Sequence, residues 1–285
     1  MTEKKIGFIG QGWIGRNYAD NFESRGFEVV RYSKDKEYVG NKDNLNSCRI
    51  IFVAVPTPTI DAKFDGSILK DAISVTKPGD TVIIKSTLIP EFTRELLNIY
   101  PDRFILISPE FLSESTARYD TDNPSRNIIG VPDINNAEWM EKAKEVMEIL
   151  PKANVHMFCT YEEASLIKYA GNCFLYVKNM FFNMLYDLVN AYECNWEEVR
   201  QGVINDPRIG DAYTNIFHKE GRGAGGHCLP KDFVAFRKMY FKHVGTDDID
   251  GCNILIQNEN KNKKLLKKSK KDINILNEVY GKGSE

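Results

Sequence analysis

The sequence predicts an α/β protein in which a doubly wound parallel sheet is followed by a smaller all-helical domain with a long central helix. Short apolar runs alternate with helical stretches through the first half of the chain, which is typical of a parallel sheet covered on both faces. A glycine-rich turn follows the first of these runs and opens into a helical pattern. One long pattern from Tyr161 to Tyr192, interrupted only by Gly171, predicts the central helix.

The short apolar runs have the length of buried strands. The expected strands are Lys5–Ile9, Glu28–Tyr32, Arg49–Val55, Thr81–Lys85, Phe104–Ser108, Asn127–Val131 and Asn154–Phe158. Shorter helices are expected from the glycine turn to about Ser24, from Asn136 to Leu150, from a capping box at Asn195 to about Asn205, and from about Pro230 to His243.

The glycine turn has the spacing Gly10-x-Gly12-x-x-Gly15 between a strand and a helix, which is the pattern of a dinucleotide-binding turn. Gly10 permits the tight turn, Gly12 lets a pyrophosphate approach the backbone, and Gly15 lets helix and strand pack closely. The pattern predicts a Rossmann-type NAD(P)-binding domain over residues 1–158. A helical central and dimerisation domain is expected over 159–245, and a connecting helix with a tail over 246–285.

Ligands of a doubly wound sheet bind beyond the carboxyl ends of its strands. Three unusual sequences lie at those ends and are expected to line one crevice: Val55-Pro-Thr-Pro58, Lys85-Ser-Thr87 and Ser108-Pro-Glu-Phe-Leu112. The expected cofactor-binding residues are Gly10, Gly12, Trp13, Ile14, Gly15, Ser33, Lys34, Val55, Pro56, Thr57, Ser86 and Thr87.

The end of the second strand decides which ribose the cofactor carries. An acidic side chain there accepts hydrogen bonds from the 2′-hydroxyl and repels a 2′-phosphate. Ser33 occupies the expected position of the acid, Lys34 follows it, and Asp35 comes two positions late. NAD is the expected cofactor, and NADP stays an alternative through Ser33 and Lys34.

Composition limits the partners. A formal net charge of -2 predicts neither nucleic acid nor an anionic membrane surface as a partner. Six widely spaced cysteines without a CxxC pair predict no disulfide framework and no metal site. The first residues lack a signal segment, and no apolar run approaches the ~18 residues of a membrane span. We therefore expect a cytoplasmic protein.

The loop from Gly223 to Asp232 places a thiol, Cys228, behind several small residues that let backbone approach a ligand. Cys228 is the first candidate for a catalytic nucleophile, and the alternative is a small buried apolar residue. Lys168 and Asn172 lie four residues apart on one helix face and could stabilise an oxyanion. A solvated surface pair is the alternative.

Several segments together resemble the UDP-glucose/GDP-mannose dehydrogenase family, in its order and roughly its spacing. They are the glycine turn, Val55-Pro-Thr-Pro58, Lys85-Ser-Thr87, Pro109-Glu-Phe-Leu112, Ile167-Lys-Tyr-Ala-Gly-Asn172, Asp206-Pro-Arg-Ile-Gly210 and Gly225-Gly-His-Cys-Leu-Pro-Lys-Asp232. The similarity runs from about residue 4 to about residue 262. It implies two oxidations of the C6 hydroxyl of a nucleotide sugar, UDP-glucose or a UDP-N-acetyl sugar, with formation of a uronic acid.

The resemblance also implies the roles of individual residues. Cys228 would capture the aldehyde intermediate, and the resulting thioester would be hydrolysed by water. The implied catalytic residues are Cys228, Lys168, Asn172, Asp232, Glu110 and Thr87. The implied substrate-binding residues are Phe111, Leu112, Glu114, Lys168, Asn172, Arg208, Gly225 and Gly226. Arg208 is similar to the family arginine that reaches the sugar in a neighbouring subunit, and we expect a homodimer formed through the helix Tyr161–Tyr192.

This chain also departs from the family pattern. Ala224 replaces an aromatic residue, His227 replaces a serine before the thiol, and Ser165 stands where a glutamate is usual. His227 resembles the branch that oxidises UDP-N-acetyl sugars, whereas Leu-Pro-Lys-Asp232 resembles the UDP-glucose branch. Family members also continue into a second Rossmann-like domain that binds the nucleotide diphosphate, which we do not expect here.

Two other functions stay open at this point. A β-hydroxyacid dehydrogenase of the 6-phosphogluconate or hydroxyisobutyrate type shares the size, the layout and a Lys/Asn helix pair. It would transfer one hydride and would not need Cys228. A non-catalytic cofactor-binding paralogue would bind the nicotinamide cofactor without turnover of any nucleotide sugar.

Overall fold

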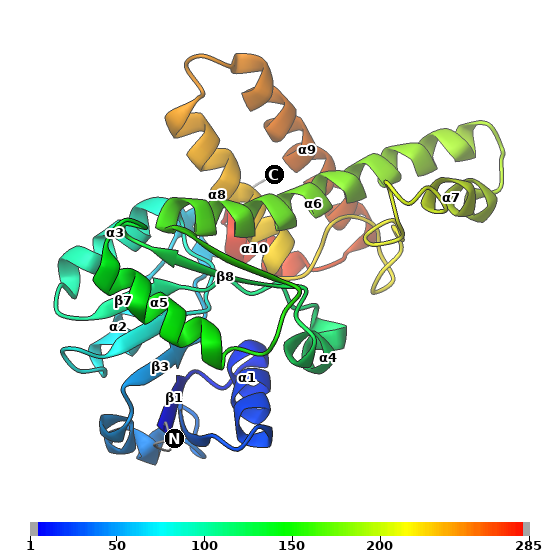
Figure 1. Ribbon diagram of the computed structural model, residues 1–285. Coiled ribbons are helices and arrows are strands. Elements are labelled where there is room, and N and C mark those ends of the chain that lie inside the picture. The colour runs from blue at the N-terminus through cyan, green and yellow to red at the C-terminus, as the bar shows by residue number, and fades with distance from the viewer. Residues whose placement is uncertain (1–4, 282–285) are drawn as a thin grey trace. The chain divides into compact units, whose positions relative to one another are not determined.

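The computed structural model describes residues 5–281. Residues 1–4, where no signal segment is expected, and residues 282–285 of the expected tail lie outside that range. The chain forms two compact units, Met1–Thr57 with Asp65–Lys168 and Pro58–Phe64 with Tyr169–Glu285 (Figure 1). Between residues 5 and 281, none of the helices combines the length and the apolarity that crossing a bilayer requires.

The first unit is built on a seven-stranded sheet with the order β2-β1-β3-β6-β7-β8-β9. Its strands are β1 (Lys5–Ile9), β2 (Glu28–Tyr32), β3 (Ile50–Val53), β6 (Thr81–Ile84), β7 (Phe104–Ile107), β8 (Arg126–Val131) and β9 (Val155–Thr160). All seven expected strands are present. Together with a long helix, they confirm the predicted fold class.

Helices cover both faces of this sheet (Figure 1). They are α1 (Trp13–Ser24), α2 (Ser67–Ser74), α3 (Pro90–Ile99) and α5 (Ala137–Ile149). A further helix, α4 (Ala117–Asp122), packs against α1, and the unit also has the 3-10 turns η1 (Val39–Asn41), η2 (Asp43–Ser47) and η3 (Glu114–Thr116). Asn136 caps α5 by accepting hydrogen bonds from the N–H groups of Glu138 and Trp139, which satisfies donors that the helix leaves open.

The core of the first unit follows from the register of the strands. Four neighbouring residues on adjacent strands lie on one face of the sheet: Phe8, Phe52, Ile83 and Leu106. On this face Phe22 of α1 packs against Phe8 and Phe52. On the opposite face, α2 contacts β3 and α3 contacts β7. Because both faces are covered, the strands are continuous apolar runs rather than alternating ones.

One pairing differs from the fully parallel sheet that the alternation predicts. β8 runs antiparallel to β7, with Ile107 opposite Gly130, and β9 then pairs parallel to β8. A parallel connection must carry the chain back across the sheet, usually on a helix of its own. Here the connection after β7 consists of η3 and of α4, which packs against α1. The chain does not return to the other end of the sheet, so β8 starts at the edge where β7 ends.

The second unit is mainly helical. Its helices are α6 (Tyr161–Ala191), which starts in the first unit, α7 (Trp196–Ile204), α8 (Cys228–His243), α9 (Ile249–Ser269) and α10 (Ile273–Tyr280). Tyr176 of α6 stacks on Phe233 of α8 with ring centroids 4.0 Å apart, at the centre of a buried cluster that includes Ala224 and Leu265. Asn195 caps α7 as the capping box predicts.

The segment 246–285, in which we expected one connecting helix and a tail, contains two helices, α9 and α10. Lys270 and Asp272 both adopt left-handed backbone angles, with φ of 54° and 51°, which end one helix and begin the next. α10 then buries Ile275 and Val279 against Val234 of α8. The break was missed because Ser269-Lys-Lys-Asp272 contains neither glycine nor proline.

A short hairpin, β4 (Thr59–Ile60) with β5 (Lys63–Phe64), was also missed. It belongs to the second unit although its sequence lies within the first. Asp61 and Ala62 have positive φ angles and form its two-residue turn. The Ala62 N–H donates to the Val279 carbonyl of α10 at 2.7 Å, so the hairpin and α10 are joined through backbone.

Candidate active site

The glycine turn has the geometry that a dinucleotide needs. Gly10 has a φ of +92°, and a Cβ there would lie 2.2 Å from the Ala54 carbonyl oxygen. A Cβ on Gly15 would lie 1.9 Å from the Gly10 carbonyl oxygen, so close packing of α1 on β1 excludes any side chain. A Cβ on Gly12 would meet nothing within 4 Å. The open space above Gly12, at the N-terminus of α1, fits a pyrophosphate.

The strand order places this turn at a topological switch point. The chain crosses from β2 on one side of β1 to β3 on the other, and ligands bind outside the carboxyl ends of the strands at such a point. Ser86 Oγ donates to the Val55 carbonyl at 2.6 Å and accepts from the Val55 N–H at 3.1 Å. Thr57 Oγ1 donates to the Thr87 carbonyl at 2.8 Å. These bonds fasten the loops after β3 and β6 to each other.

The other expected cofactor residues differ in exposure. Trp13 and Pro56 are exposed, whereas Ile14 packs against the core of the sheet. Lys34 is also exposed, and its ammonium lies 3.5 Å from the Asp71 carboxylate. A side chain this exposed is free to reach a ligand or to remain in water.

Asp35 is a residue that the sequence analysis did not include in the site. Its carboxylate accepts a hydrogen bond from the buried Ser33 hydroxyl at 2.8 Å, and its N–H donates to Ser33 Oγ at 3.2 Å. This turn brings a carboxylate back to the end of β2, where a ribose 2′-hydroxyl would bind. The late position of the acid in the sequence had concealed this.

A second cluster lies at the ends of β6 and β7. Glu110 is buried, and its Oε1 accepts a hydrogen bond from the Phe111 N–H at 2.7 Å. Its other carboxylate oxygen, Oε2, lies 3.3 Å from the buried Lys85 ammonium. Lys168 of α6 donates to the Glu110 backbone carbonyl and lies 5.6 Å from the centre of the Phe111 ring. Two cations therefore hold Glu110, one through its side chain and one through its backbone.

Beside Glu110 is a hollow in the surface of the first unit. Its lining residues are Glu110, Phe111, Leu112, Asp120, Asn123, Pro124, Ser125 and Arg126. The Arg126 guanidinium lies 3.9 Å from the centre of the Phe111 ring, because the antiparallel start of β8 brings it to the end of β7. Glu114, also expected to bind substrate, is exposed in η3.

The predicted nucleophile lies in the second unit. Cys228 is the exposed first residue of α8, where the partial positive charge of a helix N-terminus favours an anion. Asp232 lies one turn further along α8 and is buried. Burial, and to a lesser extent the charge of Cys228, raise the pKa of Tyr213. No motif in the sequence pointed to Tyr213.

Asp232 has two partners in the same unit. Its Oδ2 accepts a hydrogen bond from Asn172 Nδ2 of α6 at 2.5 Å, and its Oδ1 lies 2.6 Å from the Lys231 ammonium. Lys168 is one helical turn before Asn172 on α6. The thiol, carboxylate and amide predicted from the sequence are thus all in the second unit, whereas Glu110, Thr87 and Lys168 are in the first.

The loop that leads to Cys228 is held by residues from the C-terminal helices. Asn262 of α9 is fully buried, accepts from the Ala224 N–H at 2.8 Å and donates to the Ala224 carbonyl at 2.9 Å. The Lys271 ammonium donates to the Gly223 carbonyl, and the Asp272 carboxylate accepts from the Gly226 N–H, both at 2.8 Å. The backbone from 223 to 226 is therefore fixed by side chains that lie 38 to 48 residues downstream.

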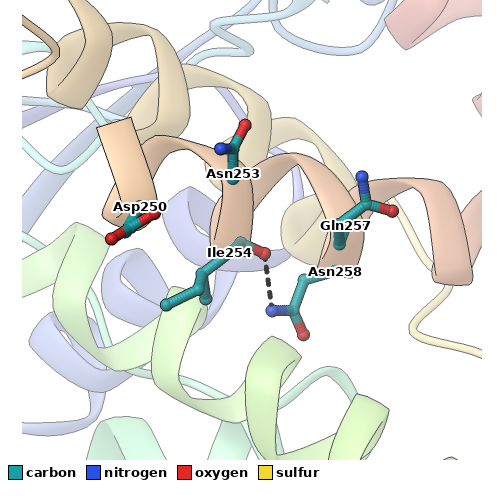
Figure 2. A pocket seen from close by; sticks show the side chains of 5 residues that line it. All are labelled: Asp250, Asn253, Ile254, Gln257 and Asn258. Atoms are coloured by element: carbon teal, nitrogen blue, oxygen red, sulfur yellow. Dashed lines mark hydrogen bonds between the residues drawn. The ribbon is translucent and has the colours of Figure 1, made fainter. Parts of the chain in front are cut away.

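Two further features lie outside these clusters. Arg208 is 87% exposed and bonds to the Asp206 carboxylate at 2.6 Å, within the turn after α7. A separate hollow lies on the first turns of α9, lined by Asp250, Asn253, Ile254, Gln257 and Asn258, as Figure 2 shows. This second hollow contains none of the predicted site residues.

The fold and the glycine turn define a dinucleotide-binding protein of the Rossmann class. The chain belongs to the UDP-glucose/GDP-mannose dehydrogenase family. Residues 38–149 match the model of the family's NAD-binding domain, and residues 162–250 match that of its central domain. The two matches together cover more than half of the chain, which accordingly carries an NAD-binding domain.

Individual relatives agree with this assignment. The chain is 33% identical over 288 residues to a UDP-glucose 6-dehydrogenase of Rhizobium meliloti, and 28% identical over 275 residues to a putative UDP-glucose 6-dehydrogenase, YtcA, of Bacillus subtilis. These alignments cover 84% and 82% of this chain but 64% and 62% of the relatives. A UDP-glucose dehydrogenase structure from Pyrobaculum islandicum has the same fold, with a TM-score of 0.76 and 22% identity over 90% of this chain and 68% of that one.

Proposed function

We propose that this chain oxidises the C6 alcohol of a nucleotide sugar to the carboxylate in two successive steps, as a UDP-glucose 6-dehydrogenase does. The observation that carries the proposal is the cluster on α8 and α6. It combines an exposed thiol at a helix N-terminus, Cys228, with a buried carboxylate, Asp232, that is hydrogen-bonded to the Asn172 amide. A dehydrogenase that performs one oxidation has no need of such a thiol.

NAD⁺, when bound, accepts one hydride in each of the two oxidations. In the first oxidation, the C6 alcohol loses a hydride and a proton and becomes an aldehyde. The Cys228 sulfur then forms a bond to the aldehyde carbon, and the thiol proton moves to the carbonyl oxygen. Loss of a second hydride and a proton leaves a thioester on Cys228. Water adds to the thioester carbon and the C–S bond breaks. The sulfur takes one proton of the water, and the carboxylate product and the second proton are released.

The remaining residues have roles in charge stabilisation and proton transfer. We propose that Lys168 and Asn172 stabilise the oxyanions that form on the C6 oxygen, because one donates from an ammonium and the other from an amide. Glu110 would act as the base for hydrolysis. Asp232 and Thr87 would orient water and carry protons.

The substrate class in this proposal is a UDP sugar, UDP-glucose or a UDP-N-acetyl sugar. Phe111, Leu112 and Glu114 follow the base directly in sequence, and Gly225 and Gly226 lie shortly before Cys228 in the same loop. NAD is favoured over NADP because the Asp35 carboxylate beside Ser33 would repel a 2′-phosphate.

The test is reduced-nicotinamide formation at 340 nm with NAD and NADP in turn, against UDP-glucose, UDP-N-acetyl sugars and GDP-mannose. We expect two equivalents of NADH per sugar consumed. One equivalent would favour a single-step β-hydroxyacid dehydrogenase instead. NAD binding without turnover on any of these sugars would favour a non-catalytic role for this chain.

We also propose that the chain forms a homodimer through α6. Besides Leu166 in its first turns, α6 has five large apolar side chains that are between 38% and 68% exposed: Phe174, Val177, Phe181, Met184 and Leu188. Their spacing alternates between three and four residues, so they form one stripe along the helix, which is the pattern of a helix–helix seam. A stripe of this size on a protein surface indicates an interface.

Phe181→Glu is expected to convert the dimer to a monomer, because it places a charge in the middle of the stripe. Light scattering at micromolar concentration measures the mass directly. Ile254→Glu is the matched control, since Ile254 is 62% exposed on α9 and outside the stripe. A wild-type monomer would contradict the dimer and also the proposed contact of the exposed Arg208 with the sugar bound to a partner subunit.

A further inference from the structure

Lys85 is a buried cation at the end of β6, and only 3% of its surface is exposed. Its ammonium has three N–H donors, and three oxygens surround it: Tyr18 Oη at 3.1 Å, Ser108 Oγ at 3.1 Å and Glu110 Oε2 at 3.3 Å. Every donor therefore has an acceptor, which is the condition under which a buried charge persists. The sequence placed Lys85 in a motif but gave it no role.

The Lys85–Glu110 ion pair is buried on both sides. Burial lowers the pKa of Lys85, and the Glu110 carboxylate opposes that effect. Burial and the same carboxylate raise the pKa of Tyr18, which stays a neutral phenol. Removing one member of a buried ion pair leaves the other as an uncompensated charge, which is far costlier than the pair itself.

We propose that Lys85 is a positioning residue that supplies the counter-charge of the Glu110 carboxylate and fixes its orientation. Lys85 binds one carboxylate oxygen, and the Phe111 N–H binds the other, so the carboxyl plane cannot rotate. The other titratable groups around Glu110 are Tyr18 of α1, Lys168 of α6, and Asp120 and Arg126, which line the same hollow. Lys168 bonds to the backbone carbonyl rather than to the carboxylate. Within residues 5–281, Lys85 is the cation that forms an ion pair with the Glu110 carboxylate.

This inference rests on the proposed function in one respect, the role of Glu110 as the base for thioester hydrolysis. A base must be ionised before it can take a proton from water. Without Lys85, the buried carboxylate would bind a proton at a higher pH, because desolvation favours its neutral form. Hydrolysis would then slow, whereas the two hydride transfers that precede it would continue, and the thioester on Cys228 would accumulate.

The first experiment follows Glu110 itself and needs no turnover. Carbon-13 NMR of the full chain labelled at the glutamate carboxyl carbon follows each titration, and Glu110→Gln identifies the Glu110 signal by its loss. In Lys85→Met, we expect the titration midpoint to move to higher pH by about one unit or more. In Tyr18→Phe, which removes one oxygen but keeps the ammonium and Ser108, we expect a clearly smaller change.

Lys85→Gln separates charge from hydrogen bonding, because its amide can still donate but carries no charge. We expect the same upward movement as in Lys85→Met, and thermal melting together with amide dispersion in the NMR spectrum establishes that each variant is folded. An unchanged midpoint in either folded Lys85 variant would overturn the inference.

The second experiment separates this inference from the proposed function. In this experiment, each Lys85 variant is mixed with NAD and UDP-glucose, and the mass of the intact protein then shows whether an acyl group is attached to Cys228. A moved midpoint with accumulated thioester supports both the positioning role and the base role. A moved midpoint without a thioester keeps Lys85 as the ion-pair partner that positions Glu110, and assigns hydrolysis to another group.

Discussion

Replacing Cys228 with alanine is expected to lower the rate of uronate formation by at least about a thousandfold, the scale on which loss of a catalytic nucleophile is felt. Without the sulfur, the aldehyde formed in the first oxidation has no covalent anchor, so the second hydride transfer lacks its thiohemiacetal. NADH formation at 340 nm measures the loss, and product analysis distinguishes aldehyde from carboxylate.

The matched control is Cys194→Ala, because Cys194 is also exposed but lies between α6 and α7. We expect this variant to retain wild-type turnover. NAD affinity should be unchanged in both variants, since the residues of the glycine turn lie elsewhere in the chain. Two equivalents of NADH per sugar from the Cys228→Ala variant would contradict the covalent mechanism.

Gly12→Ala is expected to weaken NAD binding by about a hundredfold, or about 2.7 kcal/mol, with little change in stability. Its new Cβ would meet no protein atom within 4 Å and would stand in the space that a pyrophosphate needs. Gly15→Ala should behave differently, because its Cβ would lie 1.9 Å from the Gly10 carbonyl oxygen. We expect it to destabilise the fold by about 1–3 kcal/mol, the usual cost of overpacking.

Calorimetric titration with NAD and urea unfolding measure the two effects separately. Gly202→Ala in α7 is the control, since its Cβ would also meet nothing within 4 Å and α7 carries no predicted cofactor residue. We expect this control to leave NAD affinity at the wild-type value and to raise stability by about 0.5–1 kcal/mol, because alanine replaces an exposed glycine in the interior of a helix. The sign is opposite to that expected for Gly15→Ala. Unchanged NAD affinity in Gly12→Ala would remove the glycine turn from the cofactor site.

The sheet was predictable because each buried strand left a local signal. β1 and β2 begin and end where the apolar runs predict, since strands covered on both faces are continuously apolar. The direction of β8 had no such signal, because the run Asn127–Val131 reads the same in either orientation. Direction depends on how the preceding connection is folded, and the packing of α4 on α1 is a tertiary property.

The candidate site, like the sheet, could be predicted only in part. Glycines, Cys228 and Glu110 stand in motifs whose spacing carries chemical meaning. Lys85 and Asp35 stand in or beside such motifs, but their roles follow from contacts that only the structure shows. The Lys85 ammonium is surrounded by three oxygens, and the Asp35 carboxylate accepts a hydrogen bond from the Ser33 hydroxyl at the end of β2. An ion pair between residues at the ends of two different strands produces no periodic pattern in the sequence, so it cannot be predicted from the spacing of residues.

The hairpin of β4 and β5 has a consequence for folding order and for dissection of the chain. Residues 58–64 complete the second unit, yet they are synthesised about a hundred residues before α6 begins at Tyr161, and their backbone partner is Val279 near the end of the chain. Closing that contact spans most of the polypeptide, so the helical unit cannot finish folding until the C-terminal helices exist. A fragment that begins at α6 would contain every helix from α6 to α10. It would still lack the hairpin of β4 and β5, which belongs to the same unit.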